Sequence, residues 1–161
     1  MTFGGRIERL FDAPAELVFE TLVGPEFQEE LYAGLVKDLR LERFEIDLRV
    51  GGTWTIVLGP AGGRGRPDRI TSVFREVDPP NRLVHDVAMH ASDWGRTVSF
   101  VETITLEERH GKTLVAIELG GLENEADRDA FMSGTPSFVD ALERVVALRV
   151  AREGEWGSSP Q

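Results

Sequence analysis

Residues 44–58 read FEIDLRVGGTWTIVL, and this stretch decides the fold class. Apolar and charged residues alternate over 44–50, and apolar residues return at every second position over 53–58. A period of two is typical of a strand with one face turned to the interior. The pair Gly51-Gly52 separates the two runs and favours a tight turn. The stretch therefore predicts an antiparallel hairpin.

The same alternation continues on both sides of this hairpin. Further strands are predicted at residues 6–11, 69–77, 82–89, 96–108 and 112–120. Residues 78–81 (DPPN) end the strand at 69–77, because proline cannot continue a ladder, and His110-Gly111 marks the last turn. One strand followed later by six antiparallel ones indicates a long meander with one dry face.

Helical patterns occupy the remaining segments. Ala13-Pro14-Ala15-Glu16 predicts a helix start, and Gly24-Pro25 ends that helix before a second short one at 26–33. Apolar residues recur at helical spacing from 125 to 153, which predicts one long helix. We expect a single domain over 1–153 and a polar tail over 154–161. One helix cannot fill the concave face of so long a curved sheet, so a cavity is expected between them.

Several short motifs occur in a recognisable order. They are residues 13–19 (APAELVF), 47–54 (DLRVGGTW), 76–84 (EVDPPNRLV), 112–115 (KTLV), and Gly134 followed by Val139 and Leu142. In this order they resemble the START-like (SRPBCC) superfamily, in the branch of the activator of heat-shock-protein-90 ATPase homologues. The resemblance runs from about residue 6 to 150.

This resemblance implies an α+β helix-grip fold. Such a fold has a curved antiparallel sheet of six to seven strands wrapped around a long C-terminal helix, two short helices after the first strand, and an internal pocket. The superfamily includes ligand carriers, polyketide cyclase or aromatase-like proteins and co-chaperone-type domains, so the resemblance implies no single activity. The sequence departs from the usual pattern at three places. Leu31-Tyr32 stands where paired tryptophans are common, Thr135 replaces a tryptophan, and Leu119 replaces a histidine.

Two polar residues interrupt apolar stripes of the predicted sheet. His85 lies among Leu83 and Val87, and Glu102 lies between Phe100 and Ile104. A carboxylate in an apolar wall is costly unless it is paired. The two side chains are therefore candidates for hydrogen bonding to a ligand, or for acid–base chemistry of the aldol cyclisation type. Two structural alternatives remain open: strand twist turns one of them to solvent, or they satisfy each other.

A non-catalytic protein that binds a hydrophobic or aromatic small molecule is the favoured interpretation, and no residue is assigned as catalytic. Ser72, His85 and Glu102 are expected to orient the ligand. The predicted pocket residues are Phe44, Ile46, Trp54, Ile56, Ser72, Phe74, His85, Phe100, Glu102, Ile117, Phe131, Thr135 and Phe138. The alternatives are a cyclase or aromatase-like enzyme that uses His85 or Glu102, and a co-chaperone-type interaction module with a packed interior.

Loop residues offer weaker candidates. Trp94 lies between two strands, where its ring can close over a cavity mouth or pack in the core. Arg64, Arg66 and Arg69 form a basic cluster in or beside a glycine-rich loop. They are either solvated or placed to attract an anionic ligand head. Trp156 in the tail hints at a homodimer contact.

Bulk composition narrows the possible partners. The formal net charge is −10, so nucleic acid and anionic membranes are disfavoured as partners. The chain has no cysteine, and its three histidines lack the spacing of metal ligands, so neither a metal nor another cofactor is predicted. No run of 18 apolar residues and no secretory leader is evident, which predicts a cytoplasmic protein.

Overall fold

The computed structural model describes residues 1–33, 35, 39–60, 62 and 65–157. It contains one seven-stranded antiparallel sheet with the order β1-β7-β6-β5-β4-β3-β2. The strands are β1 (Phe3–Phe11), β2 (Leu39–Ile46), β3 (Thr53–Pro60), β4 (Asp68–Asp78), β5 (Arg82–Ala91), β6 (Arg96–Arg109) and β7 (Lys112–Leu122). The helices are α1 (Ala15–Val23), a 3₁₀ turn (Pro25–Phe27), α2 (Gln28–Ala33) and α3 (Glu125–Gly157). The predicted helix-grip fold is confirmed.

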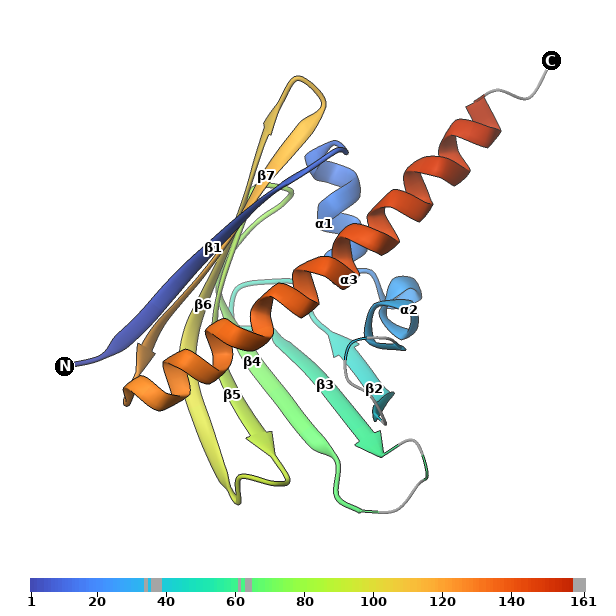
Figure 1. The fold of residues 1–161 in the computed structure, drawn as a ribbon. Coiled ribbons are helices and arrows are strands. Elements are labelled where there is room, and N and C mark those ends of the chain that lie inside the picture. Colours follow the sequence, from blue (N-terminus) through green and yellow to red (C-terminus); the bar gives the residue numbers. More distant parts are fainter. Residues whose placement is uncertain (34, 36–38, 61, 63–64, 158–161) are drawn as a thin grey trace.

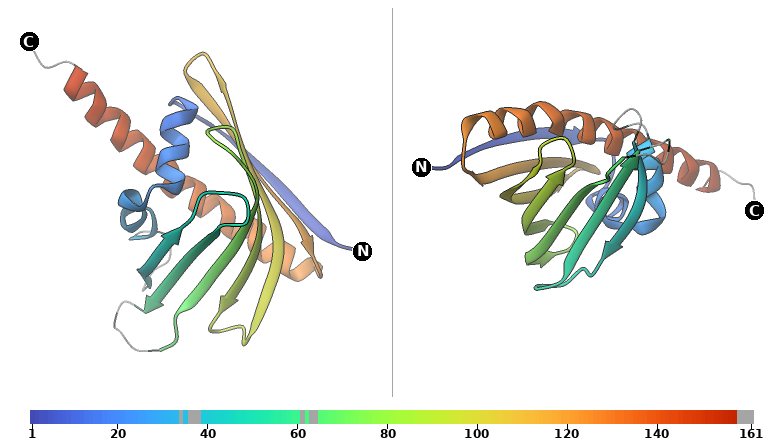
Figure 2. Two further views of the ribbon diagram at one scale, coloured as in Figure 1. Left: turned by 180° about the vertical axis from the view of Figure 1, so that it is seen from behind. Right: turned by 90° about the horizontal axis from the view of Figure 1, so that it is seen from below.

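The sheet curves around α3 (Figures 1 and 2). Both short helices contact α3, with α2 beside β2 and α1 beside β6 and β7. β1 and β2 are the edge strands, because β1 leaves the sheet for α1 and α2 before the chain returns at the opposite edge. The last turns of α3 project beyond the sheet (Figure 1). One helix therefore covers a concave surface that is wider than the helix itself.

The β2–β3 hairpin is present but shorter than predicted. The last strand pair joins Ile46 to Trp54, and residues 47–52 form the connection. Val50, predicted to continue the strand, is 63% exposed. The Gly52 amide donates to the Arg49 carbonyl at 2.8 Å and so closes a turn, while Gly51 has a φ of +81° that a residue with a side chain rarely adopts. The prediction of a two-residue turn after Val50 was therefore wrong, since the alternating pattern continues into the turn.

The long helix also differs from the predicted bounds. It runs four residues further than predicted, to Gly157, so much of the expected tail is helical; residues 158–161 lie outside the described part of the chain. At its start, Asn124 caps the helix. Its side-chain oxygen accepts a hydrogen bond from the Asp127 amide at 2.8 Å.

The core fills one end of the space between sheet and helices. Val139, Leu142, Val145 and Val146 of α3 are buried there together with the inward side chains of α1 and the sheet. Arg149 fastens α3 to α1, since it donates to the Thr21 hydroxyl at 2.9 Å. This end of the molecule is tightly packed, which leaves the cavity under the first half of α3.

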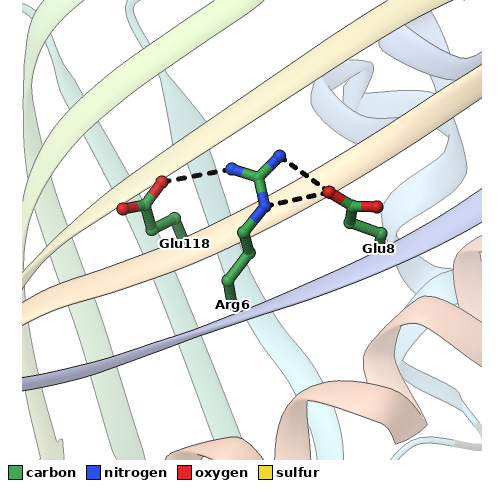
Figure 3. A network of polar contacts seen from close by, with 3 residues as sticks. All are labelled: Arg6, Glu8 and Glu118. Atoms are coloured by element: carbon green, nitrogen blue, oxygen red, sulfur yellow. Dashed lines mark hydrogen bonds and ion pairs between the residues drawn. The ribbon is translucent and has the colours of Figure 1, made fainter.

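The opposite face of the sheet carries charged residues. On β1 and β7, Arg6 donates to Glu8 at 2.8 Å and to Glu118 at 3.3 Å (Figure 3). All three side chains are about half exposed, so water screens the attraction and the network contributes little to stability. Its effect is to keep the β1 edge polar. Within the described residues, no helix is both long enough and apolar enough to cross a bilayer.

Candidate functional site

A cavity of about 390 Å³ lies between the concave face of the sheet and the first half of α3. Its wall is formed by Leu22, Tyr32, Leu35, Trp54, Ile56, Leu58, Ile70, Ser72, His85, Val87, Met89, Trp94, Phe100, Glu102, Ile104, Ala130, Phe131, Gly134, Thr135, Ser137 and Phe138. Most of these side chains are apolar, and six of them are aromatic rings. The polar groups are few, as in most sites for small organic ligands.

The register of the sheet explains why these residues meet. Trp54 pairs with Ser72, Ser72 pairs with Val87, and Val87 pairs with Phe100 across four neighbouring strands. Residues that pair across an antiparallel ladder share a face, so one row of side chains crosses the floor of the cavity. Phe131, Thr135 and Phe138 of α3 form the opposite wall.

Nine of the thirteen predicted pocket residues line this cavity. They are Trp54, Ile56, Ser72, His85, Phe100, Glu102, Phe131, Thr135 and Phe138. The structure places the other four, Phe44, Ile46, Phe74 and Ile117, outside the wall. Phe74 lies behind it and stacks on Trp54 with ring centres 5.9 Å apart. Phe44 meets Trp54 edge-on, Ile46 ends β2, and Ile117 is buried in the core.

The sequence interpretation missed several wall residues. Ile70, Val87, Met89 and Ile104 lie on the same inward stripes as the predicted residues, so the alternation itself could have found them. Trp94, which the sequence suggested for the cavity mouth, lines the wall and is 39% exposed, which places its ring at the rim. The other missed residues are Leu22, Tyr32, Leu35, Leu58, Ala130, Gly134 and Ser137, most of them on helices whose placement depends on tertiary packing.

His85 and Glu102 face each other on the cavity wall. They pair directly across β5 and β6, and His85 Nε2 lies 2.9 Å from Glu102 Oε1. The His85 side chain is 5% exposed and that of Glu102 is 24% exposed. The expectation that strand twist turns one of them to solvent is wrong. They satisfy each other, and the carboxylate still reaches the cavity.

The surroundings of His85 contain unsatisfied polar atoms. Its ring stacks on Trp54 with centres 5.4 Å apart. Among the described residues, neither His85 Nδ1 nor Trp54 Nε1 has a hydrogen-bond partner, and both atoms are buried. A buried polar atom without a hydrogen-bond partner costs free energy of folding, so both atoms destabilise the fold unless a ligand or water pairs with them.

Tyr32 adds a hydroxyl group to the same wall. Burial of the phenol and, second, the negative charge of Glu102 raise the pKa of Tyr32 far above its usual value of 10.0. The hydroxyl therefore stays neutral at physiological pH and can donate or accept a hydrogen bond. The Tyr32 ring packs against Phe138 of α3, with ring centres 6.2 Å apart.

The rim of the cavity joins α3 to the β5–β6 turn. Trp94 packs edge-on against Phe131 at 5.8 Å, and Phe131 packs against Phe100 at 4.6 Å. Arg96 and Asp127 form an ion pair with an Nη1–Oδ2 distance of 3.0 Å, and this lowers the pKa of Asp127. These five side chains thus hold the helix start against the sheet.

The basic loop does not contribute to the described wall. Arg66 and Arg69 are exposed and do not line the cavity, and Arg64 lies outside the described residues. Leu119, where the superfamily often has a histidine, is buried outside the cavity wall. The described residues contain no cluster of three or more histidine or acidic side chains able to hold a metal ion.

Comparison with known proteins places this arrangement in context. The family model of activator of Hsp90 ATPase homolog 1-like proteins matches residues 12–147. No curated protein matches the sequence.

Solved structures show the same fold. An uncharacterised protein from Rhizobium leguminosarum is 22% identical with a TM-score of 0.73, covering 91% of this chain and 95% of that one. A protein from Rhodobacter sphaeroides is 18% identical with a TM-score of 0.74, covering 92% and 93%. A protein of unknown function from Staphylococcus aureus is 15% identical with a TM-score of 0.74, covering 94% and 97%. At these identities the likeness concerns the fold alone.

Proposed function

The chain belongs to the family of activator of Hsp90 ATPase homolog 1-like proteins, and we propose that it binds a hydrophobic or aromatic small molecule. The ligand occupies the cavity between the sheet and α3, and the protein holds it without catalysing a reaction. Burial of the ligand's apolar surface supplies most of the affinity, at about 25 cal/mol per Å² removed from water.

The cavity itself is the observation that supports this proposal. Its volume of about 390 Å³ lies within the usual range for sites of small organic ligands. Its wall joins six aromatic rings to a few polar groups, of which Ser72, His85 and Glu102 are placed to orient a ligand. An interaction module was expected to have a packed interior. The described residues instead enclose a cavity, which favours ligand binding.

A cavity-filling variant tests the proposal. The probe is N-phenyl-1-naphthylamine, a neutral dye whose emission rises in apolar surroundings. We expect the wild-type protein to bind one dye molecule per chain. Thr135→Trp puts an indole into the space that Thr135 lines, so dye affinity should fall at least about tenfold while the fold is retained.

Ser133→Trp is the matched control, because Ser133 is exposed on α3 and does not line the cavity. It should bind the dye like wild type, and circular dichroism should show both variants folded. Equal dye binding by wild type and Thr135→Trp would place the dye elsewhere and contradict the proposal. Absence of binding to wild type by this dye and by a panel of neutral aromatic compounds would also contradict it.

A cyclase or aromatase-like activity is the second candidate function. The His85–Glu102 hydrogen bond on the cavity wall favours it, because such a pair can take and return a proton during an aldol-type ring closure. If the protein has this activity, it converts a bound polyketone to a cyclic product, and Glu102→Gln abolishes the conversion while the fold remains intact.

A docking role towards a chaperone, suggested by the family name, is a third candidate. A homodimer and a cytoplasmic location stay predictions.

A further inference from the structure

We propose that the ligand of this cavity carries a protonated amine attached to an apolar body, and that Glu102 is the counter-ion of that amine. This inference rests on the proposed function and names the class of ligand. It follows from the charges on the wall, from the hydrogen-bonding capacity that remains unused there, and from the aromatic rings.

The charges on the wall have one sign. Among the described residues that line the cavity, Glu102 is the only side chain with a formal charge, and none is lysine or arginine. A ligand that carries a carboxylate or phosphate would bring a second negative charge beside Glu102 without a cation to pair with it. A cationic ligand instead meets an opposite charge within an apolar enclosure. The wall therefore discriminates by charge.

Glu102 has an oxygen to spare. Its Oε1 accepts the hydrogen bond from His85 Nε2, whereas Oε2 accepts none from the described residues. Because a carboxylate only accepts, the hydrogen of this bond lies on His85 Nε2. The hydroxyl of Thr135 donates to the Phe131 carbonyl at 2.7 Å and so offers only its oxygen to the cavity. Glu102 Oε2 and the Thr135 oxygen are acceptors that suit a ligand bringing N–H groups, while Tyr32, Ser72 and Trp54 carry the donor groups of the same wall.

The rings add attraction for the same kind of group. Phe100 precedes Glu102 by two residues on β6 and so lies on the same face of the sheet, and Phe131 packs against Phe100. Tyr32, Trp54, Trp94 and Phe138 line the rest of the space. The face of an aromatic ring attracts an ammonium group, most strongly where water is excluded. Carboxylate and rings thus recognise one chemical class together.

A matched set of three compounds tests the inference by calorimetry. 1-Naphthylmethylamine, 1-naphthylmethanol and 1-naphthoic acid share one ring system and differ in the charge of their polar group. We expect the amine to bind the wild-type protein at least about tenfold more tightly than the alcohol, with the acid weakest, because a charged hydrogen bond in a buried site exceeds a neutral one. This ranking needs no variant.

Two variants then assign the effect to one residue. Glu102→Gln should remove the advantage of the amine and leave the affinity of the alcohol within about twofold. Glu107→Gln makes the same change of charge on the same strand, but its side chain is 56% exposed on the other face, so it should leave all three affinities unchanged.

The outcomes separate this inference from the proposed function. If the alcohol or the acid binds wild type as tightly as the amine, or if both variants weaken the amine equally, the inference is wrong and the proposed function stands. If neither the neutral dye and panel described above nor any of these three compounds binds wild type, the proposed function fails and the inference with it.

Discussion

Tyr32 lies where the apolar wall meets the His85–Glu102 pair, and it is the single tyrosine of the chain. Its hydroxyl has no hydrogen-bond partner among the described residues, although it shares the cavity with a carboxylate. A lone tyrosine is convenient, because its ionisation changes the ultraviolet absorbance without interference from others. The chemistry of one residue can thus be measured in the intact protein.

Titration of Tyr32 should show its raised pKa directly. The phenol has a usual pKa of 10.0, and burial with the nearby Glu102 charge raises that pKa in the folded chain. Its contribution to stability is therefore fully present below pH 10 and is lost as the pH rises towards the raised pKa. We expect the absorbance of tyrosinate to appear above pH 10 and only as the protein unfolds.

The control is the same titration in concentrated urea, where the phenol should ionise near pH 10. Tyr32→Phe should show no such absorbance change and a smaller loss of stability above pH 10. Ionisation near pH 10 in the folded protein would mean that the hydroxyl is in contact with bulk water, contrary to the structure.

At the scale of elements, α3 consists of two halves with different tasks. Its first half lines the cavity and carries Gly134 and Pro136, while Val139, Leu142, Val145 and Val146 in its middle pack into the core. Pro136 has no amide hydrogen, so the helical bond to the Met132 carbonyl is missing beside the cavity. The start of α3 is held instead by the Asn124 cap and by the Arg96–Asp127 ion pair.

Removal of the cap should destabilise the protein measurably. Asn124→Ala deletes the oxygen that accepts from the Asp127 amide at 2.8 Å, and we expect a loss of about 1 kcal/mol in the free energy of unfolding. Asn124→Ser keeps a hydrogen-bond acceptor, so its free energy of unfolding should fall by only a few tenths of that amount. Urea denaturation measures both. Equal stability of the alanine variant and wild type would show that the cap does not hold the helix start.

The same helix start should respond to acid. Hydrogen bonding to Arg96 lowers the pKa of Asp127 below its usual 3.8. The stabilising contribution of the ion pair is therefore present above pH 4 and is lost as the pH falls through the lowered pKa. The difference in stability between wild type and Asp127→Asn should shrink over that range.

For the whole molecule, some side chains only fill the core, whereas others border the cavity as well as packing against the core. Phe74 belongs to the core, with 1% of its surface exposed behind Trp54 and His85, whereas Met89 faces the cavity and is partly exposed. We expect Phe74→Ala to cost roughly 3–5 kcal/mol of unfolding free energy and Met89→Ala about 1 kcal/mol. Chemical denaturation of both variants tests this, and similar losses would mean that wall and core are one packed unit.

Particular residues show how far the sequence alone reached. The alternation of apolar and polar residues predicted which face of each strand turns inward. It therefore placed His85 and Glu102 on the same inward face. Alternation does not predict which positions along a strand border the cavity and which are covered by other side chains. Phe74 and Trp54 share that face, yet only Trp54 lines the cavity. Tyr32 was missed as a wall residue because a six-residue helix takes its position from tertiary contacts.

The division between wall and core has a consequence for evolution. Wall residues border empty space, so an exchange such as tyrosine for tryptophan at position 32 leaves the backbone and most packing contacts in place. Proteins that share 15–22% of their residues with this chain keep its fold, as the core requires. If the cavity holds a ligand as proposed, substitutions on its wall can change ligand preference while the fold is kept.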